Sequence, residues 1–209
     1  MNERDAVLFV VDDDAAMRRS LAYLFDSAGW TVQTFDSAHD FLKHYEGHVP
    51  GCLVLDVRMP LMSGLGLQQT LKDQGNHLPI IFLSGHGDLA MAVQAMKTGA
   101  CDFLEKPCKD QVLLDAVTRA VQRSIEDSRV NTQTRSAQTA LAILTVRERD
   151  VVELMAAGKP NKIIARELAI SDKTVQVHRH NAMEKLGLHS AAEIAQLLMN
   201  AGIEISGAH

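Results

Sequence analysis

Residues 6–11 read Ala-Val-Leu-Phe-Val-Val, and the chain continues directly with three aspartates, Asp12–Asp14. A short apolar run that ends in polar residues is typical of a buried strand. The pattern returns at residues 52–55, Cys-Leu-Val-Leu, which precede Asp56. The carboxyl ends of neighbouring parallel strands share one edge of a sheet, where ligands of open α/β folds bind. These acidic side chains are therefore candidates for one common site.

Apolar runs alternate with amphipathic stretches through about residue 124, which favours repeated βα units. Five such units with short connections predict an α/β fold, a doubly wound parallel sheet in the order 2-1-3-4-5. The predicted strands cover residues 6–11, 30–35, 52–56, 79–84 and 102–106. The predicted helices cover residues 15–28, 38–46, 64–74, 88–98 and 109–124.

The second half of the chain has an all-helical pattern. Two capping boxes, Thr145 with Glu148 and Ser190 with Glu193, mark helix starts. Between them we expect a short helix over residues ~161–168 and a longer one over ~172–186, ended by Gly187. These features predict a small four-helix domain. We assign residues 1–124 to the first domain, 142–209 to the second, and the polar segment 125–141 to a linker that either extends the fifth helix or is mobile.

Charge is distributed unevenly along the chain. Residues 1–125 carry 16 acidic and 11 basic side chains, a balance of −5. Residues 158–189 carry 6 basic and 3 acidic side chains, a balance of +3. An acidic half and a locally basic half indicate separate tasks, and the basic half suits contact with phosphates.

Composition narrows the class of protein. We find no run of ~18 apolar residues and no secretory signal in Met1–Asp5, so we expect a cytoplasmic protein that does not contact a membrane. Cys52, Cys101 and Cys108 fit no zinc spacing and lie in or beside apolar runs, which predicts reduced, buried thiols.

Each polar strand end has a simple explanation when taken alone. Three aspartates can cap a helix, Lys106 can be a surface lysine, and Phe103 can be an ordinary core residue. However, predicted strands one, three, four and five all end in chemically useful side chains, namely Asp12–Asp14, Asp56, Ser84 and Lys106. Grouped carboxylates suit Mg²⁺, and a metal with a carboxylate nucleophile and a lysine describes a site for phosphoryl transfer.

Residues 6–124 resemble the receiver domain of two-component response regulators. The residues that carry the resemblance are 10–14 (Val-Val-Asp-Asp-Asp), 55–60 (Leu-Asp-Val-Arg-Met-Pro), 83–87 (Leu-Ser-Gly-His-Gly) and 103–107 (Phe-Leu-Glu-Lys-Pro). The resemblance implies that Asp56 accepts a phosphoryl group from a histidine kinase. It also implies a Mg²⁺ site formed by Asp13, Asp56 and the backbone carbonyl of Arg58, with Asp12 acting through water, and a cis Lys106–Pro107 bond.

The same resemblance implies a switch. Lys106 would pair with the phosphoryl oxygens and Ser84 would hydrogen-bond to them, after which Phe103 would rotate inward. Residues 88–123 would then form a homodimer contact. Arg58 and His86 occupy positions that vary in this family, and we hypothesise that they tune the lifetime of the phosphate.

Residues 144–199 resemble the LuxR-type output domain in its FixJ-like subfamily. The matching residues include Leu144-Thr145, Arg147-Glu148, Asn161-Lys162, Thr174-Val175 and Val177-His178. The resemblance implies that helix ~172–186 enters the major groove of DNA, where Gln176, Val177 and His180 face base edges. Phosphate contacts would come from Lys162, Lys173, Thr174 and Arg179. Ile194, Leu197 and Leu198 on the last helix are expected to be exposed and to contribute to a dimer on DNA.

These features predict a phosphorylation-switched transcription regulator that works with a histidine kinase, a two-fold-symmetric DNA operator and RNA polymerase. The resemblance favours activation of transcription. The chain is not expected to be an enzyme beyond catalysing its own phosphorylation and dephosphorylation. One alternative is a receiver whose helical half binds protein or RNA. Another is a phosphatase similar to haloacid dehalogenases, which would need a later acidic metal pair that we do not find.

Overall fold

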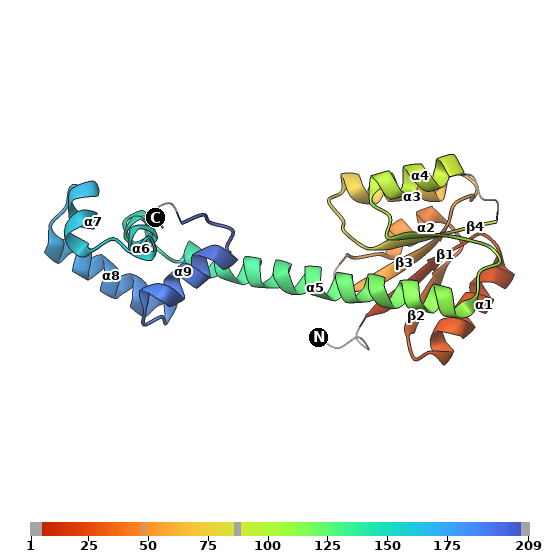
Figure 1. Cartoon of the computed structure of the whole chain (residues 1–209), viewed down its shortest axis with the longest axis horizontal. Helices are drawn as coiled ribbons and strands as arrows, with labels where there is room; N and C mark the ends of the chain where they lie inside the picture. The colour runs from red at the N-terminus through yellow and green to blue at the C-terminus, as the bar shows by residue number, and fades with distance from the viewer. Residues whose placement is uncertain (1–5, 48, 86–88, 206–209) are drawn as a thin grey trace. The chain divides into compact units, whose positions relative to one another are not determined.

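The computed structural model describes residues 6–47, 49–85 and 89–205, and the chain divides into two compact units, residues 1–128 and 129–209. The first unit contains a five-stranded sheet in the order β2-β1-β3-β4-β5, with all pairs parallel (Figure 1). The predicted topology is therefore confirmed. The strands are β1 (Val7–Val11), β2 (Thr31–Phe35), β3 (Gly51–Asp56), β4 (Ile80–Ser84) and β5 (Asp102–Glu105).

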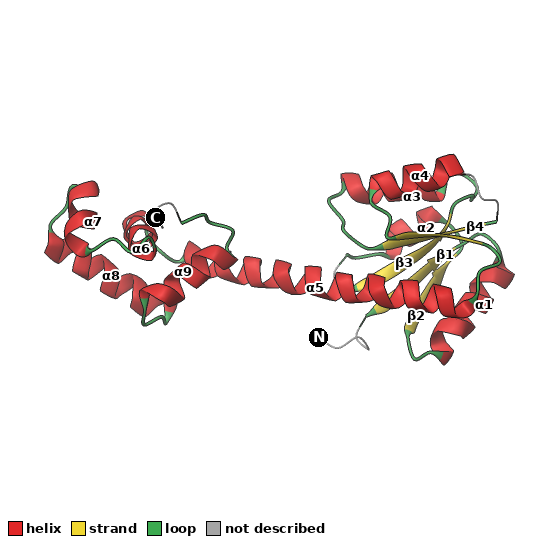
Figure 2. Ribbon diagram, in the orientation of Figure 1, coloured by secondary structure: helices red, strands yellow, loops and turns green. Residues whose placement is uncertain are grey.

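Helices cover both faces of this sheet (Figure 2). Two of them, α1 (Ala15–Ser27) and α5 (Asp110–Ala142), pack on one face through residues that include Phe25, Leu113 and Val117. The opposite face is covered by α2 (Ala38–His44), α3 (Gly64–Asp73) and α4 (Leu89–Thr98). Because β3 and β4 are buried along almost their whole length, they consist of nearly continuous apolar residues.

The fifth helix differs most from its predicted length. It continues to Ala142 and so includes the segment that we assigned to a linker. The segment contains no Gly or Pro that would end a helix, and Arg123 pairs with Asp127 one turn later, with 3.9 Å between Nε and Oδ2. Its last part, including Ala137 and Leu141, belongs to the core of the second unit.

The second unit adds four helices, α6 (Val146–Ala156), α7 (Asn161–Glu167), α8 (Asp172–Leu186) and α9 (Ala191–Asn200). Both predicted capping boxes are present, and Ser171 caps α8. Gly187 ends α8 with a φ of 64°, a conformation that costs glycine little. The predicted helix boundaries in this half are confirmed to within about two residues.

Two expectations about burial are wrong. Ile194 and Leu198 are fully buried in the core of the second unit and Leu197 is partly buried, because α9 turns its apolar stripe inward. Met199 is a large apolar residue of that helix that is exposed. Cys52 is buried as expected, but Cys101, just before β5, and Cys108, in the segment between β5 and α5, are only partly buried. In the described part of the chain, no helix is both long and apolar enough to cross a membrane.

Candidate functional site

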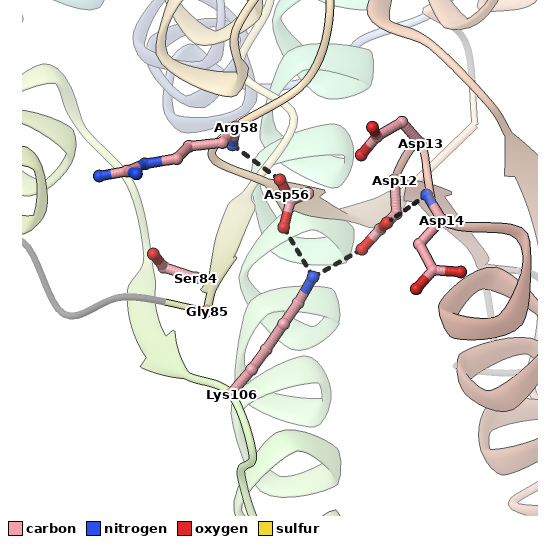
Figure 3. Close-up of a pocket in the computed structure, with 8 residues that line it drawn as sticks. All are labelled: Asp12, Asp13, Asp14, Asp56, Arg58, Ser84, Gly85 and Lys106. Carbon is pink, nitrogen blue, oxygen red and sulfur yellow. Dashed lines mark hydrogen bonds and ion pairs between the residues drawn. The ribbon is translucent and has the colours of Figure 1, made fainter.

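Residues at the carboxyl ends of β1, β3, β4 and β5 meet at one edge of the sheet and line an open cavity of about 240 Å³ (Figure 3). The topology explains this location, because β1 and β3 are neighbours at the point where the strand order reverses. The residues that line the cavity are Asp12, Asp13, Asp14, Asp56, Arg58, Ser84, Gly85 and Lys106.

Lys106 lies at the centre of this site. Its Nζ atom donates hydrogen bonds to Oδ2 of Asp12 at 2.7 Å and to Oδ1 of Asp56 at 2.6 Å (Figure 3). The bond that follows, Lys106–Pro107, is cis as expected. Since Pro107 has no N–H to continue the sheet, β5 ends at Glu105, one residue before the predicted end.

Burial and charge have opposite effects on the pKa values of Asp56 and Lys106. Burial raises the pKa of Asp56 above its ordinary value, although the hydrogen bond and charge of Lys106 and the N–H of Arg58 partly offset this. Burial alone would lower the pKa of Lys106, but its bonds to Asp12 and Asp56 outweigh burial and raise that pKa. The lysine therefore stays protonated while it holds two carboxylates together.

The three consecutive aspartates have three different surroundings. Asp12 is 3% exposed, accepts from Lys106 and from the N–H of Asp14, and is held in place by Arg18, which donates to its carbonyl at 2.7 Å. Asp14 caps α1, accepting from the N–H groups of Ala16 and Met17. The carboxylate of Asp13 is exposed and makes no hydrogen bond or ion pair with any other described residue.

Asp12, Asp13 and Asp56, which all carry carboxylates, line the same cavity. Carboxylates of this kind suit a hard cation such as Mg²⁺. Among the residues that the structure describes, no three metal-binding side chains converge on one point. In proteins Mg²⁺ usually keeps several water ligands and is bound directly by only one or two carboxylates.

The remaining residues of the expected receiver site lie on β4, on β5 and in the segment after β3. The N–H of Arg58 donates to Oδ2 of Asp56 at 2.7 Å, while its side chain is exposed (Figure 3). Ser84 ends β4 and is 2% exposed. On the next strand, Phe103 is partly buried, and its ring centroid lies 6.1 Å from that of Phe82. His86 lies outside the described residues.

The second unit presents α8 with one polar and one buried face. Val175 and Ala182 are fully buried, whereas Lys173, Gln176 and His180 are exposed and Val177 is 50% exposed. Lys162 is exposed near the start of α7. The other two side chains that were expected to contact phosphates make hydrogen bonds inside the second unit. Thr174 shares a hydrogen bond with Ser171, and Arg179 donates one to Asn161.

Sequence reasoning did not identify the ion pair that joins α6 to α8. Glu148 completes the capping box of α6 and also accepts from Nζ of Lys185 at 2.7 Å. The hydrogen bond from Lys185, followed by the N–H of Thr145, lowers the pKa of Glu148 from 4.5 to about 2. The capping box was visible in the sequence, but the spacing of 37 residues to Lys185 has no local signature.

We predict that Glu148→Gln lowers the free energy of unfolding of the second unit by about 1–2 kcal/mol at neutral pH, because it removes the ion pair and keeps a capping residue. Since the folded pKa is depressed, the contribution is complete above about pH 4.5 and is lost as the pH falls toward about 2. Hydrogen exchange of the α6 backbone amides measures this loss of stability. As a control, Glu167→Gln breaks the more exposed pair with Lys159 and should cost less than ~1 kcal/mol.

Comparisons with known proteins agree with both halves of this description. Residues 8–118 match the response regulator receiver domain, and residues 142–198 match the luxR family of bacterial regulatory proteins. The chain is 43% identical to the transcriptional regulatory protein FixJ of Bradyrhizobium diazoefficiens over 94% of this chain and 96% of that protein. It is 45% identical to the transcriptional regulatory protein TdiR of Thauera aromatica, over 93% and 86% respectively.

Solved structures show the same likeness. The response regulator StyR is 44% identical, with a TM-score of 0.85 over 93% of this chain and 98% of that one. The N-terminal part of FixJ is 43% identical, with a TM-score of 0.55 over 58% of this chain and 96% of that one.

Proposed function

We propose that phosphorylation of Asp56 controls this chain, which belongs to the FixJ-like response regulators with a receiver domain and a LuxR-type DNA-binding domain. The chain is a transcriptional response regulator. In our proposal residues 1–124 form the phosphoacceptor domain, 125–141 connect the domains and 142–209 bind DNA. The observation that carries the proposal is Lys106, which holds Asp56 beside Asp12 at a single cavity.

The proposed reaction is transfer from a phosphohistidine of a sensor kinase. A carboxylate oxygen of Asp56 attacks phosphorus, the P–N bond breaks, and its electron pair returns to the imidazole of the donor. Lys106 is close enough to stabilise charge on the phosphoryl oxygens. Bound Mg²⁺ supplies further neutralisation of those oxygens, with Asp13, Asp56 and the carbonyl of Arg58 as ligands and Asp12 acting through water. In our proposal the chain catalyses only this transfer to its own Asp56 and the later hydrolysis of the aspartyl phosphate, in which water attacks phosphorus and releases inorganic phosphate.

The signal then leaves the site through Ser84 and Phe103. A phosphoryl group adds about −1.5 to −2 charges and strong acceptor oxygens, which should draw the Ser84 hydroxyl inward. Phe103 lies two register positions from Ser84 on the neighbouring strand and can occupy the space that this movement leaves. The altered surface includes α4 and the start of α5, where several apolar side chains are exposed, namely Leu89, Val93, Met96 and Val112. We propose this surface as the homodimer contact.

The second unit provides the output. We propose that α8 enters the major groove, with Gln176, Val177 and His180 at base edges. Lys162, Lys173 and Thr174 contact phosphates, which fix position without reading sequence. Arg179 belongs to the same surface. A cytoplasmic regulator of this design binds a symmetric operator and recruits RNA polymerase.

Light scattering after size exclusion, combined with DNA footprinting, tests the proposal. With Mg²⁺ and beryllofluoride, which stands in for a phosphoryl group, the wild-type protein should shift from monomer to dimer and protect a symmetric DNA site. Chelation of Mg²⁺ should reverse both effects. A dimer that protects no DNA would favour the alternative of a receiver that controls protein or RNA binding, and an unchanged mass would remove dimerisation from the proposal.

Arg58 gives a further prediction. Its exposed side chain lines the cavity through which water must approach the phosphorus atom. Arg58→Ala should therefore change the rate of dephosphorylation by about 3- to 10-fold, a modest effect because Lys106 and the metal ligands remain. The rate is measured as loss of the phosphoryl group after the donor is removed. Arg19→Ala, an exposed arginine on α1, is the control, and equal decay in all three proteins would contradict the prediction.

A further inference from the structure

We propose that Arg179 is a positioning residue of the DNA-binding surface, which fixes the start of α7 against α8 instead of contacting a phosphate. This inference rests on the DNA-binding function proposed above. It departs from the sequence-based expectation, which placed Arg179 among the phosphate contacts.

The contact itself is specific. Arg179 is partly buried on α8, and its NH1 group donates to Oδ1 of Asn161, the first residue of α7. The two residues are 18 positions apart, so the bond spans the turn of the helix-turn-helix pair. In contrast, Lys162 and Lys173 on the same two helices are exposed.

Helix stability does not explain this bond. α7 begins after Pro160, which supplies no side-chain cap. The side chain of Asn161 is directed to Arg179 and does not cap the helix. A cation beside the start of a helix meets the positive end of the helix dipole, which is unfavourable. The bond between Arg179 and Asn161 is therefore better explained by the position in which it holds the start of α7 against α8.

The bond joins two groups of proposed DNA contacts. Lys162 directly follows Asn161 on α7, and Gln176 precedes Arg179 by one turn on α8. Ile164 and Val175 belong to the apolar core that these helices share, but the hydrophobic effect is non-directional and selects the register of the helices less sharply than a hydrogen bond does. A guanidinium bond is directional, so it sets the register between a phosphate contact on α7 and base contacts on α8.

A positioning role and a phosphate contact have different salt signatures. Each phosphate contact releases counterions, so affinity falls as the salt concentration rises. Losing one phosphate contact makes the slope of log affinity against log salt concentration less steep by about 0.9. It also weakens binding to all sequences equally. Losing a positioning bond leaves Lys162 and Lys173 in the protein, so it should change the slope by much less than about 0.9 and mainly reduce the difference in affinity between a preferred and a scrambled duplex.

The experiment uses the full-length protein with Mg²⁺ and beryllofluoride. The probes are a duplex that the wild-type protein selects from a random DNA pool and a scrambled version of it, each titrated over a salt series. Arg179→Met removes the donor and its charge, whereas Asn161→Ala removes only the acceptor. Lys173→Met is the matched control for a phosphate contact. Thermal unfolding of each variant is recorded alongside.

We expect Arg179→Met and Asn161→Ala each to reduce discrimination about 5- to 30-fold while changing the slope by much less than about 0.9, and the double variant to be no worse than either single one. Lys173→Met should reduce the slope and keep discrimination. The proposal is overturned if Arg179→Met behaves like Lys173→Met while Asn161→Ala behaves like the wild type. It is also overturned if Asn161→Ala stays folded and discriminates normally. If the wild-type protein selects no duplex, the DNA-binding function fails first, and separately.

Discussion

Asp56→Asn is expected to abolish stable phosphorylation and the beryllofluoride-dependent dimer. An amide nitrogen carries no available lone pair and no charge, so the variant loses the nucleophile and the negative charge of one of the three proposed direct metal ligands. The rate of phosphoryl transfer should fall ~10³-fold or more, as for the loss of other catalytic nucleophiles. The fold should persist, because Lys106 keeps its 2.7 Å bond to Asp12. Burial also opposes ionisation of Asp56, so a neutral side chain is tolerated there.

Two of the three consecutive aspartates, Asp13 and Asp14, supply graded controls for this variant. Asp14→Asn should behave like the wild type, since asparagine caps a helix as well as aspartate does. Asp13→Asn should be phosphorylated at high Mg²⁺ concentration but need about 10-fold more of it, because it loses one proposed ligand. Intact mass after incubation with acetyl phosphate measures all three. A phosphorylated Asp56→Asn protein would place the acceptor elsewhere.

The pattern of apolar runs predicted the strands of the first unit because burial of a strand is visible in its own residues. A strand buried on both faces must be apolar, and the residue that ends it at the carboxyl edge is free to be polar, so Asp12 and Asp56 were visible as departures from apolar runs. Capping is equally local, which is why Thr145 and Ser190 located their helices correctly. The cavity itself followed from topology, which brings these strand ends together.

The failures concern contacts between distant residues. An amphipathic helix shows that a stripe will be buried but not against what, and so Ile194 and Leu198 were assigned to a surface when they form a core. Gln68 is similar: it is 4% exposed, and its side-chain amide donates to the carbonyl of Ala95 on α4. Nothing in the sequence distinguishes this glutamine from a surface residue. The bonds of Arg179 and Glu148 are of the same kind.

Lys106→Met is expected to slow phosphorylation of Asp56 by ~10²-fold, the usual cost of removing one charged donor from a transition state. Methionine keeps most of the length of the lysine side chain and lacks its ammonium group, so the loss is mainly electrostatic. Lys109→Met, at an exposed lysine three residues later, should leave the rate unchanged. The rate is followed by intact mass with acetyl phosphate and Mg²⁺. Equal rates in both variants would show that the two carboxylates do not need the lysine.

The pH dependence separates lost catalysis from a damaged site. Lys106 lowers the pKa of Asp56 against the effect of burial, and Asp12 raises it. Without the lysine the pKa of Asp56 must rise, because burial and the charge of Asp12 then act with less opposition. The nucleophile is the ionised carboxylate, so phosphorylation of Lys106→Met should rise with pH over a higher range than in the wild type. If Lys106→Met is instead slower than the wild type by the same factor at every pH, Lys106 does not affect the pKa of Asp56. In that case its role is limited to stabilising the phosphoryl group.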